Sequence, residues 1–190
     1  MSKDIERIEA TDPRQFREWL EKHHATAPAV WLVYYKKDSG TPSITWSQAV
    51  DEALCYGWID SKSKPIDQHR YEQYFTPRNP KSPWSKVNKN KIKGLIRASR
   101  VRHPGLKAVS EAQDNGSWTI LDDAENHIVP EDLAAAFPDQ AARDNFEALT
   151  PSRRRNILQW IVLAKREETR SRRIAQTAQA ATNGTAPNNL

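Results

Sequence analysis

The stretch AVWLVYYKK, residues 29–37, decides how this chain folds. It is rich in aromatic and β-branched residues, which favour a β-strand. Its apolar run is nearly continuous, so we expect both faces of the strand to be covered. A sheet has to form around this segment, and the flanking sequence has to supply the other strands and the helices that pack on them.

Helix signals lie on both sides of this strand. The segment DPRQ at residues 12–15 combines an N-cap aspartate, a first-turn proline and a glutamine three residues after the cap. It predicts a helix that ends near residue 24. Thr45 and Gln48 repeat the capping pattern and predict a second helix, which ends at Gly57, where a positive φ is often needed.

The segments 58–66 and 70–76 are predicted as two further strands joined by a short turn. After them the chain carries only helix signals: a basic helix over residues 83–102, short helices to residue 149, a longer one from Thr150-Pro151 and a last basic one from Glu167. The fold class is therefore α+β, a small antiparallel β-sheet packed by helices and followed by an all-helical C-terminal module.

This order divides the 190 residues into four parts. We expect a flexible lead-in at 1–11, an α+β core domain at 12–110, a helical C-terminal module at 111–180 and a disordered tail at 181–190. On the helix from Pro151 we expect Ile157, Trp160 and Ile161 to face the interior.

Composition limits the kinds of function. The net charge is +5, and residues 73–110 contain no acidic residue, which favours an anionic partner. The N-terminal residues have no signal-peptide pattern and no apolar run reaches about 18 residues, so we expect a cytoplasmic protein. One cysteine, and five histidines without ligand spacing, predict no metal, and the chain has no nucleotide-cofactor motif.

The basic stretch 75–103 holds nine Lys or Arg residues. Ser82 as N-cap and Pro83 as first helical residue would direct backbone N–H groups at an anion. Arg78 could fold over this turn and Trp84 could form an apolar wall. The alternative is that Arg78 pairs with a core carboxylate and Trp84 is packing. The expected ligand-binding residues are Arg78, Ser82, Trp84, Ser85, Asn88 and Asp60.

A second interpretation is a nucleic-acid-binding module that uses the basic helices 83–102 and 151–178. Its expected contacts are Lys86, Lys89, Lys93, Arg97, Arg153, Arg154, Arg170 and Arg173. Aromatic residues are sparse after Trp84, which argues against a single-strand platform on these helices. A solvated basic face is the simpler alternative.

A third interpretation is an enzyme of unknown reaction around Asp60, Glu52 and Arg78. Asp60 follows Trp58-Ile59 in a predicted strand and could form a salt bridge or cap a turn, or it could bind a ligand or act as an acid or base. For Glu52, a solvated helix face is the favoured expectation. We expect Cys55 to be buried and inert, because it sits at the C-terminal end of its helix, where the dipole disfavours a thiolate.

Three segments carry a family resemblance: ALCYGWIDSKSKPID (53–67), YFTPRNPKSPWSKVNKNKI (74–92) and LTPSRRRNILQWIVLAKREETRSRRI (149–174). They resemble the YdeI/OmpD-associated family, also called bacteriocin-protection proteins, over about residues 15–178. The resemblance implies no catalytic residues and no cofactor, and the family's name implies bacteriocin protection or association with a porin. We therefore expect a stress-response or bacteriocin-protection protein that binds a small anion or other ligand without catalysing a reaction.

Overall fold

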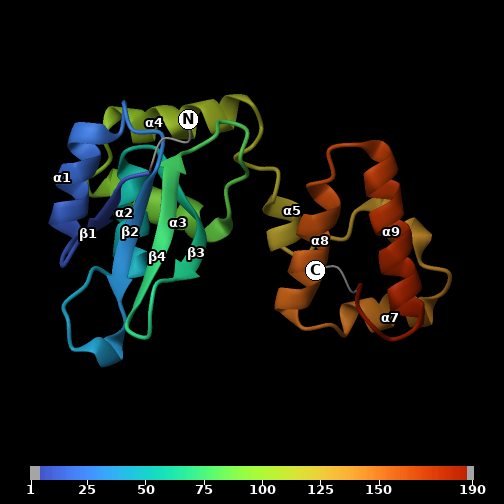
Figure 1. Cartoon of the computed structure of the whole chain (residues 1–190). Helices are drawn as coiled ribbons and strands as arrows, with labels where there is room; N and C mark the ends of the chain where they lie inside the picture. The colour runs from blue at the N-terminus through green and yellow to red at the C-terminus, as the bar shows by residue number, and fades with distance from the viewer. Residues whose placement is uncertain (1–4, 188–190) are drawn as a thin grey trace. The chain divides into compact units, whose positions relative to one another are not determined.

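The computed structural model describes residues 5–187. The chain forms two compact units (Figure 1). The first comprises Met1–Ser82 and Val87–Ser117, and the second comprises Pro83–Lys86 and Trp118–Leu190.

The first unit is built on a four-stranded sheet of order β1-β2-β4-β3. Strand β2 (Val30–Tyr35) pairs antiparallel with β4 (Arg70–Pro77), which pairs antiparallel with β3 (Trp58–Pro65). The predicted α+β class and these three strands are confirmed. Strand β1 (Arg7–Glu9) was not predicted, and it adds a parallel edge to β2, so the sheet is mixed and not purely antiparallel.

The register divides the side chains of the sheet between two faces. Leu32 lies opposite Gln73, and Asp60 opposite Phe75, on the first face. Helices α1 (Pro13–His23) and α2 (Trp46–Cys55) pack on this face. Phe16 of α1 makes an edge contact with Phe75 at a centroid separation of 5.2 Å. Trp31 and Tyr74, which also pair, lie on the second face because successive side chains alternate.

Helix α3 (Lys86–Arg97) is shorter at both ends than the predicted span of 83–102. Ser99 has a φ of 55°, and the N–H of Arg100 donates to Leu95 O at 3.0 Å, the pattern of a Schellman motif. At the start, residues 83–85 are not helical, so Lys86 and not Pro83 is the first helical residue, and its N–H donates to a carboxylate oxygen of Glu125 at 3.3 Å.

Glycines let the end of α2 approach α4 (His103–Asp114). Gly57 has a φ of +71°, as expected for a helix exit, and a Cβ on it would lie 2.7 Å from the carbonyl oxygen of Pro104. A Cβ on Gly105 would lie 2.6 Å from the carbonyl oxygen of Cys55. Because neither contact leaves room for a side chain, these two positions fix where α4 meets the end of α2.

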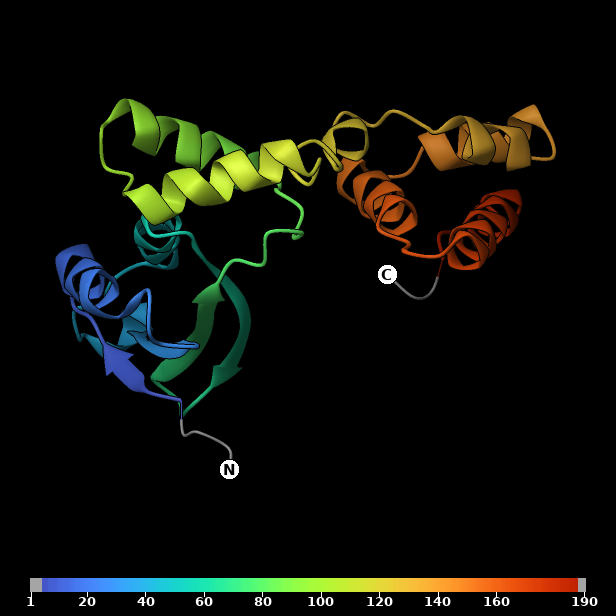
Figure 2. The ribbon, with the colours of Figure 1, turned by 90° about the horizontal axis from the view of Figure 1, so that it is seen from above.

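The second unit is helical, with its own core (Figure 2). Leu133, Phe146, Ile157 and Ile161 are buried there, as predicted for the last two, whereas Trp160 is only partly buried. The helices are α5 (Asp122–Glu125), α6 (Glu131–Ala136), α7 (Gln140–Glu147), α8 (Pro151–Val162) and α9 (Glu167–Thr182).

The two ends of the chain were expected to be flexible. Within the described residues, β1 lies in the expected lead-in, α9 continues to Thr182, and Ala186 packs in the helical core. Residues 1–4 and 188–190 lie outside the described part.

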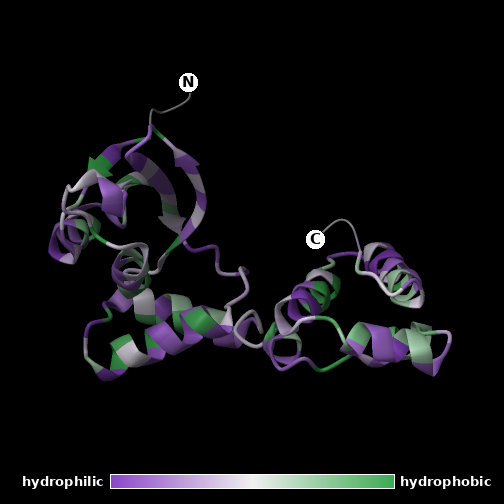
Figure 3. Ribbon diagram, turned by 90° about the horizontal axis from the view of Figure 1, so that it is seen from below, coloured by the Kyte–Doolittle hydropathy of each residue, from purple (hydrophilic) through white to green (hydrophobic). Residues whose placement is uncertain are grey.

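Apolar and polar segments alternate along the helices in Figure 3. Over residues 5–187, no helix has the length and hydropathy required to cross a membrane.

Candidate functional site

Asp60 is the centre of a polar cluster on the helix-covered face of the sheet. The indole Nε1 of Trp46 donates to Asp60 Oδ2 at 2.9 Å, and Gln73 Nε2 donates to the same oxygen at 3.1 Å. Trp46 is the first residue of α2, and the capping box of Thr45 and Gln48 fixes where that helix begins. We use the name Asp60 cluster for Tyr34, Trp46, Asp60, Gln73 and Arg78.

Tyr34 contributes a buried hydroxyl to this cluster. Its ring stacks on that of Tyr71 at a centroid separation of 4.9 Å. Its hydroxyl has no hydrogen-bond partner among the described residues. Burial raises the pKa of Tyr34, and the nearby Tyr71 and Asp60 raise it further, so the hydroxyl keeps its proton at neutral pH. A buried donor without an acceptor is uncommon in folded proteins.

Arg78 brings positive charge towards Asp60. Its backbone N–H donates to Gly57 O at 2.9 Å, which fixes the start of its side chain beside the start of β3. Burial lowers the pKa of Arg78 to about 10, and the negative charge of Asp60 acts in the opposite direction. Arg78 is therefore cationic at neutral pH and close enough to Asp60 for their charges to interact.

The other predicted anion-binding residues are distributed between the two units. Ser82 and Asn88 belong to the first unit, and Trp84 and Ser85 to the second. Trp84 is buried, with its ring 5.0 Å from that of Trp118. Of the six residues, the structure relates Asp60 and Arg78 to each other, together with Tyr34, Trp46 and Gln73, which sequence reasoning missed.

The residues expected to contact nucleic acid differ in their availability. Lys89 is only 7 % exposed. Arg170 binds both oxygens of Asp132 at 2.7 and 3.0 Å. Arg154 donates to Glu147 O at 3.0 Å, and Arg173 lies over the ring of Trp160 at 4.9 Å. The exposed members of the set are Lys86, Lys93, Arg97 and Arg153.

Glu52 is not on a solvated helix face, so the favoured expectation for it was wrong. It is 2 % exposed and accepts from Arg17 at 2.8 Å and from Arg100. Arg17 also donates to Arg100 O at 2.9 Å. Because both carboxylate oxygens bind arginines, Glu52 is a structural anion that ties α1 and the segment after α3 to α2.

Cys55 is buried, as predicted. Burial raises the pKa of its thiol, while the neighbouring Arg17 acts in the opposite direction. The thiol is therefore protonated at neutral pH, which does not suit a nucleophile. Within residues 5–187, no group of three His, Cys, Asp or Glu side chains is placed to hold a metal ion.

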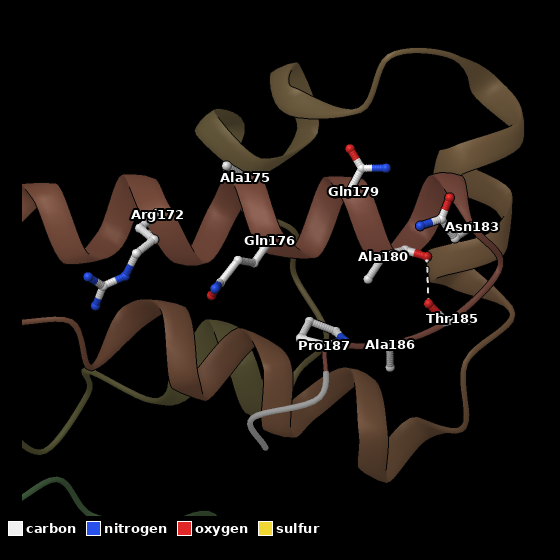
Figure 4. A pocket seen from close by; sticks show the side chains of 9 residues that line it. All are labelled: Arg172, Ala175, Gln176, Gln179, Ala180, Asn183, Thr185, Ala186 and Pro187. Carbon is white, nitrogen blue, oxygen red and sulfur yellow. Dashed lines mark hydrogen bonds between the residues drawn. The ribbon is translucent and has the colours of Figure 1, made fainter.

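The second unit has a hollow of about 570 Å³ between α9 and residues 185–187 (Figure 4). Gln176, Gln179 and Asn183 border it, and Thr185 closes one end by donating to Ala180 O at 3.1 Å. None of the residues predicted from the sequence lines this hollow.

Two family models match the chain. Residues 8–108, just over half of the chain, match the model described as Domain of unknown function (DUF8412). Residues 126–184 match the model described as Bacteriocin-protection, YdeI or OmpD-Associated, which confirms the predicted family for this part of the chain. Of the three segments that carry the resemblance, this match contains 149–174, whereas 53–67 and 74–92 lie within the first match. No curated protein and no solved structure gives a significant match.

Proposed function

We propose that this chain, which belongs to the family described as Domain of unknown function (DUF8412) and carries a bacteriocin-protection, YdeI or OmpD-associated match at residues 126–184, is a non-catalytic ligand-binding protein. Its first unit would bind a small polar ligand at the Asp60 cluster. The binding would serve a protective role of the kind that the second family's name describes.

The buried hydroxyl of Tyr34 is the observation that carries this proposal. Leaving a buried donor without an acceptor costs about 1–3 kcal/mol. The remainder of the helix-covered face is largely apolar, with Val30, Leu32 and Phe75 buried. A polar cluster that retains an unsatisfied donor in such a core is suited to receive an acceptor from a ligand.

The charges of the cluster define the class of ligand. The cationic Arg78 favours an anionic group, and the hydroxyl of Tyr34 can donate to the same group. Asp60 would repel a simple anion, but its carboxylate would accept a hydrogen bond from an O–H or N–H group of the ligand. A small carboxylic acid with a hydroxyl or amino group on the neighbouring carbon satisfies both requirements. Chloride or acetate satisfies only the first.

Thermal unfolding with a panel of α-hydroxy and α-amino acids tests the proposal. A ligand at 100 times its Kd stabilises the folded state by about 2.7 kcal/mol. For a chain of this size the melting temperature should rise by about 5–10 °C. Acetate and chloride should give no comparable rise.

Tyr34→Phe and Tyr71→Phe form a matched pair for this experiment, because the two rings are stacked. Tyr34→Phe should unfold at the same or a higher temperature without ligand, since it removes an unsatisfied donor, and should lose much of the ligand-induced rise. Tyr71→Phe should retain that rise. A panel without any hit, or a Tyr34→Phe variant that responds like the wild type, would refute the proposal.

A further inference from the structure

The second face of the sheet is concave, and no helix of the described part of the first unit lies on it. Figures 1 and 2 show helices α2, α3 and α4 on the opposite side. The edge strands curl towards each other over this face, because Arg7 of β1 and Lys64 of β3 both bind Glu72 of the central strand β4. Glu72 is 1 % exposed although it is charged, and it anchors the two edges.

Aromatic rings form part of the floor of this face. Trp31 of β2 and Tyr74 of β4 are cross-strand partners with ring centroids 4.7 Å apart. Tyr35 lies further along β2, with the guanidinium of Arg70 6.0 Å from its ring centroid. Neighbouring rings on two strands of an open sheet provide surfaces on which flat bases can stack.

Lysines lie directly above these rings. Lys62 Nζ is 5.0 Å from the ring centroid of Tyr74 and 5.7 Å from that of Trp31, and Lys64 Nζ is 4.4 Å from Trp31. Both lysines are exposed. Trp31 is 9 % exposed beneath them and supports the more exposed ring of Tyr74, which a base could reach if the Lys62 side chain turned outwards. Lysine side chains are long and flexible enough to do so.

Beside the rings, the face has a hollow of about 450 Å³ bordered by Arg7, Lys64 and Arg70. Glu9 and Glu72 also border it. With Lys62, the strands place more cations than carboxylates on this face, so its charge is net positive. The face therefore combines concavity, stacking surfaces and positive charge.

We propose that this concave face binds single-stranded nucleic acid. Phosphates would interact with Lys62 and with the outward-facing N–H groups of Lys64 and Arg7, which keep their ion pairs with Glu72, and a base would stack on Tyr74 once Lys62 has moved to the backbone. A duplex keeps its bases stacked inside the double helix. It would therefore bind only through the attraction between its phosphates and the cations of this face. The site is distinct from the Asp60 cluster, which lies on the other face of the sheet.

Fluorescence anisotropy of a labelled oligo-dT strand tests this inference on the full chain. Lys62→Ala should reduce the salt dependence of binding by about one phosphate contact. Tyr74→Ala should weaken binding about 5- to 100-fold through the loss of stacking, and Tyr74→Phe should bind like the wild type. An unlabelled duplex of the same length should compete poorly.

The control is the pair Lys93→Ala and Arg97→Ala, two exposed cations on α3. They should leave the affinity unchanged if the sheet binds the strand. Melting temperatures show whether Tyr74→Ala is folded, and Lys62→Ala provides an exposed substitution if it is not. No binding at low salt, equal competition by the duplex, or loss of affinity in the α3 variants but not in the sheet variants would overturn the inference.

Discussion

Glu52 is a single residue on which several elements depend. Glu52→Gln leaves Arg17 and Arg100 facing a neutral group in a partly buried site. Breaking a buried ion pair typically costs about 3–5 kcal/mol. Because the Arg100 side chain is 45 % exposed, we expect Glu52→Gln to lower the free energy of unfolding by a smaller amount, about 2–3 kcal/mol. Urea unfolding measures this difference.

Asp51→Asn is the matched control on the same helix. Asp51 pairs with Lys91 at 2.7 Å, but both side chains are partly exposed. Asp51→Asn should therefore lower the free energy of unfolding by less than about 1 kcal/mol. If the two variants were equally destabilised, burial of the Glu52 carboxylate would not be what makes its ion pairs strong.

Glu72 should make stability depend on pH in the acid range. The hydrogen bond from Arg7 lowers the pKa of Glu72 from its ordinary 4.5, burial raises it, and Lys64 lowers it further. A carboxyl with a lowered folded-state pKa stabilises the fold above its unfolded pKa, and this contribution is lost as pH falls through the folded pKa.

Urea unfolding between neutral pH and about pH 2 measures this contribution. Glu72→Gln should lose stability at neutral pH, and its difference from the wild type should shrink as the pH falls below 4.5. A difference that stays constant over the whole range would mean that the Glu72 charge contributes nothing.

At the scale of elements, the contact between α2 and α4 depends on a glycine. Gly57→Ala would place a Cβ 2.7 Å from Pro104 O in a backbone with φ +71°. The positive φ alone costs about 1–3 kcal/mol in such cases. We expect a loss of at least that size in thermal or urea unfolding.

Gly94→Ala gives the opposite expectation. Gly94 lies inside α3, and a Cβ there would meet nothing within 4 Å. Alanine in a helix is more stable than glycine by up to about 1 kcal/mol. The substitution should therefore stabilise the protein. Destabilisation by Gly94→Ala would show that this side of α3 is packed more closely than the structure indicates.

Elements with local signals could be predicted from the sequence. The caps at Asp12, Thr45 and Thr150 are all present, each accepting from the backbone of its helix. Strand β1 could not be predicted, because three residues carry too little pattern and their pairing with β2 is long-range. The end of α3 was misplaced because a serine, and not a glycine, adopts the positive φ.

The candidate site was less predictable than the fold, because its contacts, like the pairing of β1, join residues that are far apart in the sequence. Asp60 and Arg78 were singled out by their motifs, but Gln73 and Trp46 reach Asp60 from other elements, 13 and 14 residues away in the chain. Glu52 binds Arg17, which is 35 residues away in the sequence, and Arg100, which is 48 residues away. Contacts of this range depend on the tertiary fold and leave no local sequence pattern.

At the scale of the whole molecule, the separate core of the second unit leads to a prediction. Phe146 is 1 % exposed in that core, and Phe146→Ala should cost the helical unit about 3–5 kcal/mol. Native-state hydrogen exchange should then show faster exchange in α7, α8 and α9, with strands β2 and β4 keeping their protection. Equal loss of protection in both sets would show that the chain unfolds as one cooperative unit.

We propose that the Asp60 cluster receives a small ligand with an acidic group and a neighbouring hydroxyl or amine. A crystal structure of the protein soaked in lactate tests it most directly. We predict density with a carboxylate oxygen within hydrogen-bond distance of the Tyr34 hydroxyl, facing the Arg78 guanidinium, and a ligand hydroxyl on Asp60. A cluster whose Tyr34 hydroxyl is bonded to the protein itself or to water, with no lactate beside it, would contradict the account.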